Sequence, residues 1–540
     1  IYNRFFFFFK YTKKIDKKIS KIEKYSIFAH VKKYNKFFLK MKKEDSKTTT
    51  KKSCKAEQTV EQQVEITEQE IKIQEEMETK KTRIESDLIG SREIPMECYY
   101  GVQTVRAIEN FPITGIGINR YPNVVKYLGV IKLAAAIANY ETGKISKEIY
   151  EGIAKACQDV IDGKLNDQFP VDVIQGGAGT STNMNANEVI ANRALEYMGY
   201  QPGQYEYCSP NDHVNASQST NDAYPCATRL AIYADHLEMI SHLDLLISSL
   251  ERKAREFKDV IKMGRTQLQD AVPMTLGLSF HAFAQSLRNE KEHLIHDSKE
   301  FLYVNMGATA IGTGICSTLE YREACVKALR DLTKWDINLS EDLVEATSDA
   351  SSMLVYSNAL RTLCTNLCKV CNDLRLMSSG PRCGLNEINL PKMQPGSSIM
   401  PGKVNPVIPE VVNQICYRVI GNDTCIMLGA NNAQLELNVM EPVMVYSLLE
   451  SIELLTNGFD VLRKLCIDGI TANKEHCREM VENSIGIITA LVPVLGYKPC
   501  SKLAKEALET GKGVVALIRE HGLLTEEQIN EAMATEKIIL

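Results

Sequence analysis

The sequence lacks any apolar stretch long enough to cross a membrane or to form the core of a secretory signal. Its run of phenylalanines, at positions 5–9, has only five residues, whereas a membrane-spanning helix needs about 20 apolar residues. With 44% hydrophobic and 24% charged residues, the composition is that of a large globular protein. We therefore expect no membrane partner and a cytoplasmic location.

Acidic residues are scarce at the N-terminus and abundant in the rest of the chain. Residues 1–52 hold 17 Lys and Arg against 4 Asp and Glu, a net charge of +13, and the whole chain carries −5, which leaves −18 for the rest. An acidic body argues against nucleic acid as a partner. The basic head is interpreted as a solvated tail, and import into an organelle through it is left open.

No methionine precedes Met41, and residues 1–40 are biased toward Lys, Asn, Ile, Phe and Tyr. This bias suits translated AT-rich flanking sequence, so we expect residues 1–40 not to be native and Met41 to be the start. N-terminal sequencing of the native protein that found Ile1 would contradict this. Residues 42–81 are rich in Lys, Glu, Gln and Thr, so a disordered extension over residues 1–82 is predicted.

Patterns for metal and cofactor binding are also missing. The nine histidines are dispersed, with no H-E-x-x-H and no paired C-x-x-C, so no metal ligand set is predicted. The stretch GGAGTST lacks the third glycine of a dinucleotide fingerprint, and no GK[ST] follows it. We expect no organic cofactor. Activation by a divalent cation cannot be read from the sequence.

The sixteen cysteines are scattered and are expected to be free thiols. Cys364, Cys368 and Cys371 have a spacing that some iron–sulfur enzymes use. Offsets of four and seven also define one face of a helix, and leucines continue that apolar pattern on both sides. A buried helix face is the favoured interpretation, because cysteine is among the most buried residue types.

Sustained period-two alternation is almost absent, whereas apolar residues recur at spacings of three and four. This pattern predicts a mainly helical protein with unusually long helices. Several of them are apolar on more than one face, which indicates burial in a bundle or against another subunit. Examples are residues 124–140, 223–257, 275–305, 352–377 and 411–428.

Four polar joints interrupt the helices, at residues 176–189, 209–225, 262–273 and 395–406. The first predicts a helix N-terminus with free N–H groups near Thr180, suited to an anion, although simple capping explains it as well. The second holds Ser219, Thr220 and Asn221. A polar binding patch and simple capping and turn chemistry explain these residues about equally well. In the third, Thr266 and Gln267 have no distinctive pattern.

The fourth joint, PGSSIMPGKVNP at residues 395–406, is the strongest candidate for a site. Its prolines and glycines exclude a helix interior or a central strand. Lys403 and Asn405 can both face one carboxylate, one supplying charge and the other a directional donor. Ser397 and Ser398 add hydroxyls and consecutive backbone N–H groups, which bind oxyanions. The loop is predicted to hold a carboxylate.

The stretch GSSIMPGKVNP resembles the specific G-S-S-x-M-P-x-K-x-N loop of the fumarase/aspartase superfamily. Further similarity runs from about residue 83 to the C-terminus, through GTSTNMNANEVIANRALE, SQSTNDAYP, GRTQLQDAVPM, NPVIPEVVNQICYRVIGND and ENSIGIITALVP. The segment RIESDLIGSREIPMECYYGVQTVRAIENF and the late CIDGITAN are most similar to the members that act on aspartate.

The resemblance implies an all-α, three-domain fold: an N-terminal helical domain at 83–219, a central long-helix bundle at 220–473 and a small C-terminal helical domain at 474–540. It also implies a homotetramer built on the central helices. Each active site would then collect loops from three subunits.

The resemblance further implies reversible anti elimination from a succinate-like substrate, giving fumarate through an aci-carboxylate intermediate. This chemistry needs a base and a dense set of donors around one carboxylate. Ser397 corresponds to the base, reacting as a stabilised alkoxide, and Lys403 and Asn405 to residues that hold the carboxylate. The remaining substrate-contacting positions correspond to Thr180, Ser219, Thr220, Asn221, Thr266, Gln267 and Ser398.

Gln267 distinguishes the substrates. Many superfamily members carry His there, whereas glutamine cannot exchange a proton near neutral pH. The ammonium group of L-aspartate leaves as neutral ammonia, so an acid is less necessary than for a leaving hydroxide. Ammonia elimination is therefore expected, and malate dehydration by a fumarase is the alternative. A catalytically silent scaffold is the third hypothesis. Glu410 is expected to accept a hydrogen bond from Gln267, and Ser209 stands where fumarases tend to have a histidine of an accessory anion site.

Overall fold

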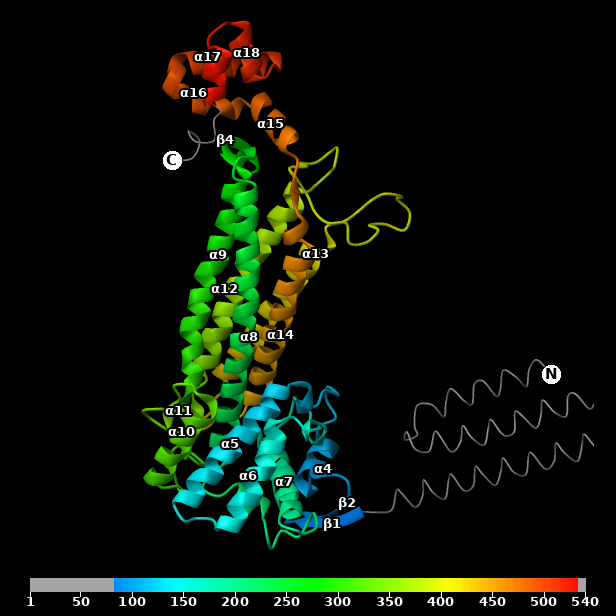
Figure 1. The fold of residues 1–540 in the computed structure, drawn as a ribbon, viewed down its shortest axis with the longest axis vertical. Coiled ribbons are helices and arrows are strands. Elements are labelled where there is room, and N and C mark those ends of the chain that lie inside the picture. Colours follow the sequence, from blue (N-terminus) through cyan, green and yellow to red (C-terminus); the bar gives the residue numbers. More distant parts are fainter. Residues whose placement is uncertain (1–81, 533–540) are drawn as a thin grey trace, which may run out of the picture. The chain divides into compact units, whose positions relative to one another are not determined.

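The computed structural model describes residues 82–532, so the predicted N-terminal extension, apart from Thr82, lies outside the described part of the chain. Helices dominate this part (Figure 1), as predicted. Its eight strands are short and form four two-stranded pairs. The all-α fold class predicted from the sequence is therefore confirmed.

The first part of the described chain packs short helices around an apolar core. Helix α5 is buried along most of its length, which explains why its sequence is apolar on every side. The elements are β1 (Thr82–Asp87), β2 (Gly90–Pro95), α4 (Val102–Asn110), η1 (Ile118–Arg120), α5 (Pro122–Glu141), α6 (Lys147–Ile161), η2 (Asn166–Gln168), α7 (Thr180–Tyr197) and the π-helix η3 (Pro210–Val214).

Five long helices form a bundle in the middle of the chain (Figure 1). They are α8 (Thr220–Glu256), α9 (Leu276–Asp297), α12 (Ser351–Met377), α13 (Val407–Asn431) and α14 (Glu441–Leu465). The shorter elements between them are β3 (Ile261–Thr266), β4 (Gln269–Thr275), η4 (Ser298–Leu302), β5 (Tyr303–Val304), α10 (Leu319–Thr333), β6 (Asn338–Leu339), α11 (Glu345–Ser348) and β7 (Ile388–Asn389).

The predicted long helices are confirmed at four of the five ranges. The prediction of one helix over residues 275–305 was wrong at its end, because α9 stops at Asp297 and a 3₁₀ helix and a short strand follow. Phe301 and Leu302 are still buried. Their apolar spacing therefore continues the helical pattern in the sequence, although the backbone is no longer α-helical there.

Three of the predicted joints contain regular structure, the first because α7 begins at Thr180, inside residues 176–189. Residues 262–273 were interpreted as a loop, but they lie in a β-hairpin of β3 and β4. Residues 210–214 form the π-helix η3, where Ser209 Oγ accepts a hydrogen bond from Asp212 N at 3.0 Å. The apolar periodicity of these segments extends over too few residues to distinguish a strand or a single helical turn from a loop.

The last part of the chain has a small apolar core of its own, to which Ile261 and Met263 of β3 also contribute. Helix α8 begins at Thr220 and α15 at Lys474, at the predicted domain limits, and the division into three domains stays a prediction. The elements are η5 (Ile467–Gly469), β8 (Thr471–Ala472), α15 (Lys474–Asn483), η6 (Ile485–Ile487), α16 (Ile488–Leu495), α17 (Tyr497–Thr510), α18 (Val514–Glu520) and α19 (Glu526–Ala532).

The cysteines of residues 82–532 are all free thiols. Cys364 and Cys371 are buried on α12 and Cys368 is half-buried, so the helix-face interpretation is confirmed. Within the same residues no cluster of three or more His, Cys, Asp or Glu side chains could hold a metal ion. None of the described helices is long and apolar enough to span a bilayer.

Candidate active site

The predicted loop at residues 395–406 is a narrow hairpin that leads into α13. Gly396 N donates to Lys403 O at 2.7 Å, and Asn405 Nδ2 donates to Gly396 O at 2.9 Å. A Cβ on Gly396 would lie 2.9 Å from Asn405 N and from Lys403 O. Only glycine therefore allows the two sides of the loop to approach this closely.

The tip of this loop surrounds the hydroxyl of Ser397 with donors. Ser397 Oγ accepts hydrogen bonds from Ile399 N and Met400 N, each at 3.2 Å. Two N–H groups directed at one oxygen stabilise negative charge on it. Ser398 and Lys403 are exposed, and Lys403 forms no ion pair within residues 82–532. The tip thus combines a hydroxyl that accepts hydrogen bonds from two N–H groups with an exposed lysine on the same loop.

Thr266 and Gln267 lie at the turn of the β3–β4 hairpin, and both are exposed. The turn residues Gln267 and Leu268 have φ values of 53° and 63°. This left-handed conformation suits a two-residue hairpin turn but costs about 1–2 kcal/mol for each residue other than glycine. Within one chain of residues 82–532, Gln267 makes no hydrogen bond to Glu410, so that expected contact stays a prediction.

A buried carboxylate connects this hairpin to the segment that leads into the loop at residues 395–406. Glu387 is 0% exposed. Arg265 Nη1 lies 2.5 Å from Glu387 Oε1, and Lys262 Nζ lies 2.9 Å from Oε2 as an ion pair without hydrogen-bond alignment. The Glu387 carbonyl accepts from Asn473 N at 2.9 Å. Glu387 therefore joins β3, the start of the loop segment and the residue preceding α15.

We expect Glu387→Gln to lower the free energy of unfolding by about 3–5 kcal/mol, because the buried Lys262 and the half-buried Arg265 would each lose the one charged partner that they have within residues 82–532. Urea unfolding followed by circular dichroism measures this. The matched control is Glu509→Gln, whose exposed pair with Lys505 contributes less than about 0.5 kcal/mol. Equal stability of the two variants would show that the buried pairs do not stabilise the fold.

Thr180 is the first residue of α7, as the sequence predicted, and it is exposed. Its Oγ1 donates to Gly177 O at 2.7 Å. The N-cap Gly179 has φ 87°, and a Cβ there would lie only 2.4 Å from the ring of Tyr224, which belongs to α8. The close contact between this glycine and Tyr224 fixes the start of α7 against α8.

Gly179→Ala is expected to destabilise the protein by about 3 kcal/mol or more, since the left-handed backbone costs about 1–2 kcal/mol and overpacking adds about 1–3 kcal/mol. The control is Gly199→Ala, because Gly199 has nearly the same φ, 86°, but open space around its Cβ position. Only the backbone effect of about 1–2 kcal/mol is expected there. Thermal unfolding compares them, and equal losses would exclude the role of the Tyr224 contact.

Ser219, Thr220 and Asn221 form the N-terminus of α8. Ser219 and Asp222 make a capping box, in which Asp222 Oδ1 accepts from Ser219 N at 2.9 Å. Pro225 has no N–H for the carbonyl of Asn221, and that carbonyl accepts from Asn305 Nδ2 at 3.0 Å instead. Burial raises the pKa of Asp222 to about 6, an effect that its N–H donors and Lys132 oppose.

Lys132 lies behind this N-terminus and was missed by the sequence analysis. It is 0% exposed, and its Nζ donates to three amide oxygens, those of Asn183 at 2.8 Å, Gln218 at 2.9 Å and Asn215 at 3.0 Å. Burial lowers the pKa of Lys132 to about 7, against the charge of Asp222. A lysine inside the apolar run VIKLAAA was the signal that could have identified it.

The predicted site residues fall into two groups in the single chain. Thr180, Ser219, Thr220 and Asn221 lie where α7 and α8 begin. The others lie toward the opposite end of the long helices, at the β3–β4 turn, in the loop before α13 and in the first turn of α13 (Figure 1). Helix α8 has 37 residues, so it is about 56 Å long at 1.5 Å per residue. One chain does not bring the two groups together.

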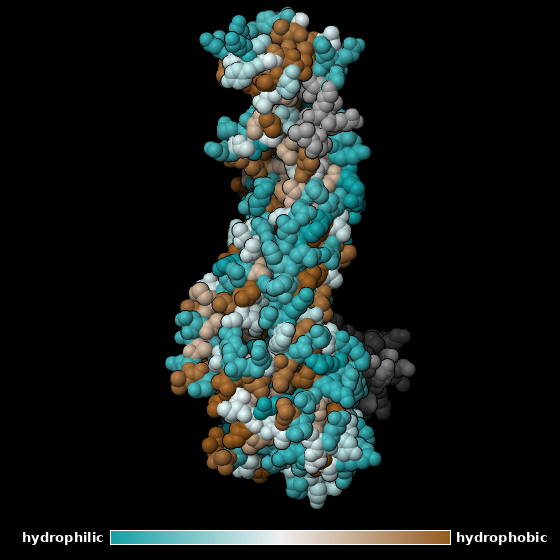
Figure 2. Space-filling model, turned by 90° about the vertical axis from the view of Figure 1, so that its left-hand side faces the viewer, coloured by the Kyte–Doolittle hydropathy of each residue, from teal (hydrophilic) through white to brown (hydrophobic). Residues whose placement is uncertain are grey.

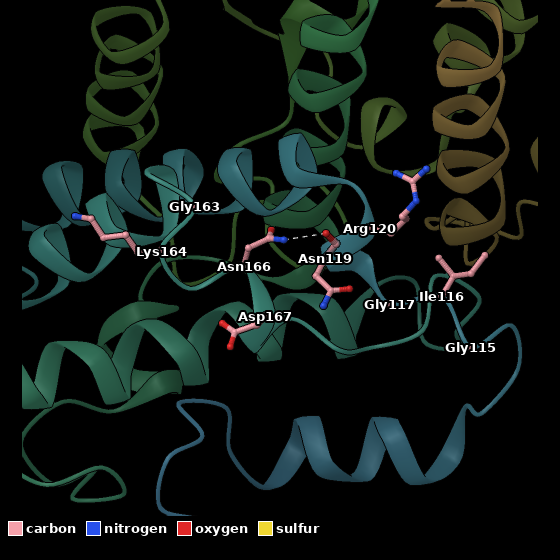
Figure 3. Close-up of a pocket in the computed structure, with 9 residues that line it drawn as sticks. All are labelled: Gly115, Ile116, Gly117, Asn119, Arg120, Gly163, Lys164, Asn166 and Asp167. Carbon is pink, nitrogen blue, oxygen red and sulfur yellow. Dashed lines mark hydrogen bonds between the residues drawn. The ribbon is translucent and has the colours of Figure 1, made fainter. Parts of the chain in front are cut away.

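A cavity of about 700 Å³ lies in the first part of the chain, and Figure 3 shows its lining side chains. None of them is a predicted site residue. Its cations are already paired, Arg120 with Glu453 and Lys164 with Asp159. The lining residues are Gly115, Ile116, Gly117, Asn119, Arg120, Gly163, Lys164, Asn166 and Asp167.

Comparison with known proteins shows long, nearly complete similarity to curated lyases. The chain is 51% identical over 459 residues to the aspartate ammonia-lyase of Pseudomonas aeruginosa, covering 85% of this chain and 97% of that protein. It is 52% identical over 458 residues to the aspartate ammonia-lyase of Escherichia coli K12, covering 85% and 96%. The corresponding enzyme of Helicobacter pylori is 51% identical over 457 residues.

Solved structures agree with this similarity. A fumarate lyase:delta crystallin from Brucella melitensis bound to cobalt matches with a TM-score of 0.82 at 49% identity, covering 85% of this chain and 99% of that one. A class II fumarase from Schistosoma mansoni matches with a TM-score of 0.78 at 34% identity, covering 85% and 98%. Family models described as lyase and as fumarase C C-terminus match residues 90–421 and 487–539. The chain therefore belongs to the fumarase/aspartase superfamily of lyases.

Proposed function

We propose that this protein eliminates ammonia from L-aspartate to give fumarate, reversibly and with anti geometry. The observation that carries this assignment is the 51–52% identity to aspartate ammonia-lyases over 85% of the chain. Gln267 supports it, because glutamine only hydrogen-bonds and cannot protonate a leaving hydroxide. The ammonium group of aspartate leaves as neutral ammonia and does not need that proton.

Ser397 is the proposed base for the Cβ proton. A serine hydroxyl is too weak a base in water and must react as an alkoxide. The N–H groups of Ile399 and Met400, each 3.2 Å from Ser397 Oγ, would stabilise that alkoxide as donors in an oxyanion hole do. Lys403, exposed and without an ion pair among residues 82–532, adds positive charge on the same loop.

The other predicted residues are proposed to hold the carboxylate on which the second negative charge develops. Lys403 supplies charge, and Ser398 a hydroxyl. Asn405 has one N–H bonded to Gly396 O, which leaves the second N–H for a ligand. At the other group, Ser219, Thr220 and Asn221 add donors that are not themselves charged. Thr180 belongs to the same group, but its N–H and its hydroxyl both donate to Gly177 O, so one of these bonds has to open before it can donate to the substrate.

The proposed active unit is a homotetramer in which each site takes residues from three subunits. The two groups of site residues are separated by the length of α8, so copies must meet for a site to be complete. Large apolar side chains are exposed on the bundle helices, and Figure 2 shows apolar side chains spread along one face of the molecule. Exposed examples are Leu237, Leu245, Val355, Leu376, Val411, Tyr417, Met427 and Leu428.

The loop at residues 395–406 is proposed to close over the substrate as a hinged lid. Its base is held by the Gly396–Lys403 and Asn405–Gly396 hydrogen bonds, whereas its tip residues Ile399 and Met400 are exposed. The reaction transfers a proton and needs no organic cofactor. The proposed location is the cytoplasm.

A single assay tests the proposed reaction. Purified protein receives L-aspartate or L-malate, and fumarate is followed by its ultraviolet absorbance. We expect fumarate from aspartate. Fumarate from malate alone would establish the fumarase alternative, and fumarate from neither would favour a silent scaffold.

A further inference from the structure

The hydrogen-bond network behind Thr220 determines which groups donate and which accept. Gln218 Nε2 donates to Val214 O and Ala216 O, at 3.0 and 3.1 Å. Asn215 Nδ2 donates to Gln218 O at 3.2 Å. Because backbone carbonyls only accept, the side-chain oxygens of Gln218 and Asn215 must face Lys132. Lys132 Nζ thus has three oxygen acceptors for its three protons, which favours the ammonium form.

The orientation of Asn183 follows from these contacts. Its Oδ1 accepts from Lys132 Nζ at 2.8 Å. Its Nδ2 donates to Asn215 Oδ1 at 3.2 Å and to Thr220 Oγ1 at 3.1 Å. If the Asn183 amide were flipped, its NH2 group would face the Lys132 ammonium and its oxygen would face Asn215 Oδ1, and both contacts would be repulsive. Asn183 is therefore held as a donor toward Thr220.

Thr220 Oγ1 is consequently an acceptor on its buried side. A hydroxyl has one proton and two lone pairs. Within residues 82–532 no hydrogen bond uses the hydroxyl proton of Thr220, so this proton remains for a ligand. We propose that Lys132 and Asn183 are positioning residues that hold the Thr220 hydroxyl as a hydrogen-bond donor toward the substrate carboxylate. This inference rests on the proposed function, in which Thr220 contacts the substrate.

The decisive variant is Asn183→Asp, which keeps the shape and the contact with Lys132 but can no longer donate to Thr220. The Thr220 hydroxyl would then donate to the new carboxylate and present a lone pair to the substrate. We expect KM for aspartate to rise about 10- to 100-fold, as for a lost hydrogen bond to a charged group. A similar rise is expected for Thr220→Val, with kcat changing less than KM in both.

A double-mutant cycle separates this role from a purely structural one. If Asn183 acts through the hydroxyl of Thr220, adding Thr220→Val to Asn183→Asp raises KM no further than the more severe single change. If the KM increases of the two single variants multiplied in the double variant, the proposal would be overturned. The matched control is Asn187→Asp, which places the same charge in the cluster, where Asn187 Nδ2 donates to Asn215 Oδ1 at 3.1 Å without touching Thr220. Its effect on KM should multiply with that of Thr220→Val.

A second variant keeps the test decisive if Asn183→Asp does not fold. Asn183→Ala removes the donor and leaves the Thr220 proton free, so its KM should rise less than in Thr220→Val. An equal or larger rise in a folded Asn183→Ala protein would overturn the proposal. Aspartate turnover by the wild-type protein is measured first. If the wild-type protein does not turn over aspartate, the proposed function is refuted. If it does, but the KM increases of Asn183→Asp and Thr220→Val are independent, only this inference is refuted.

Discussion

Replacing Ser397 by alanine is expected to lower kcat for aspartate by about 10²- to 10⁴-fold, the usual contribution of a positioned base. The fold should be unchanged, because the side chain is only half-buried and its hydrogen-bond partners within residues 82–532 are two N–H groups of its own loop. Steady-state kinetics with ultraviolet detection of fumarate, combined with thermal unfolding, measures both quantities.

Ser398→Ala is the matched control, since it removes a neighbouring hydroxyl that is proposed only to donate to the carboxylate. Its loss should be smaller and should appear in KM as well as in kcat. If Ser397→Ala kept more than about a tenth of the wild-type kcat, far above the range for a lost base, the assignment of the base would be wrong.

The second large effect is a recovery of activity when two impaired proteins are mixed, measured at an aspartate concentration well below the KM of the Thr220→Val protein. Thr220→Val changes the first residue of α8, a helix about 56 Å long, and Ser397→Ala changes the loop that precedes α13. If each site combines residues of different subunits, a mixed assembly contains sites in which both positions are wild type. Random mixing of equal amounts should restore about one quarter of wild-type activity, since each position is wild type in half of the chains.

The experiment unfolds the two variants together, refolds them and measures fumarate formation. The control mixes Ser397→Ala with Lys403→Ala, two changes in one loop, which always leave every site with a defect. Recovery in both mixtures, or in neither, would contradict sites shared between subunits.

Sequence reasoning predicted the helical architecture well because long helices repeat their apolar spacing over many turns. Helices α5, α8, α12 and α13 were recognised from this repetition. It failed where a segment was short. The β3–β4 hairpin has few residues per strand, and a 3₁₀ turn continued the pattern beyond α9.

The chemistry of the site was also readable, but its placement was not. Ser397 and Lys403 were singled out by residue type within one short loop. The separation of Thr220 from that loop depends on the length and direction of α8, which no local pattern reveals. Lys132 was missed because its role depends on three amide oxygens far from it in sequence, the nearest being that of Asn183.

The left-handed backbone at Gln267 has an evolutionary consequence. Among residues other than glycine, histidine is several-fold enriched at positive φ, so a histidine fits this turn at least as well as the glutamine does. Codons for glutamine and histidine differ only in their third base. A single nucleotide change could therefore exchange an amide for a titratable ring at the position that separates the two chemistries, with no rearrangement of the hairpin. Reaction type can in this way diverge in a lineage while the scaffold is inherited unchanged.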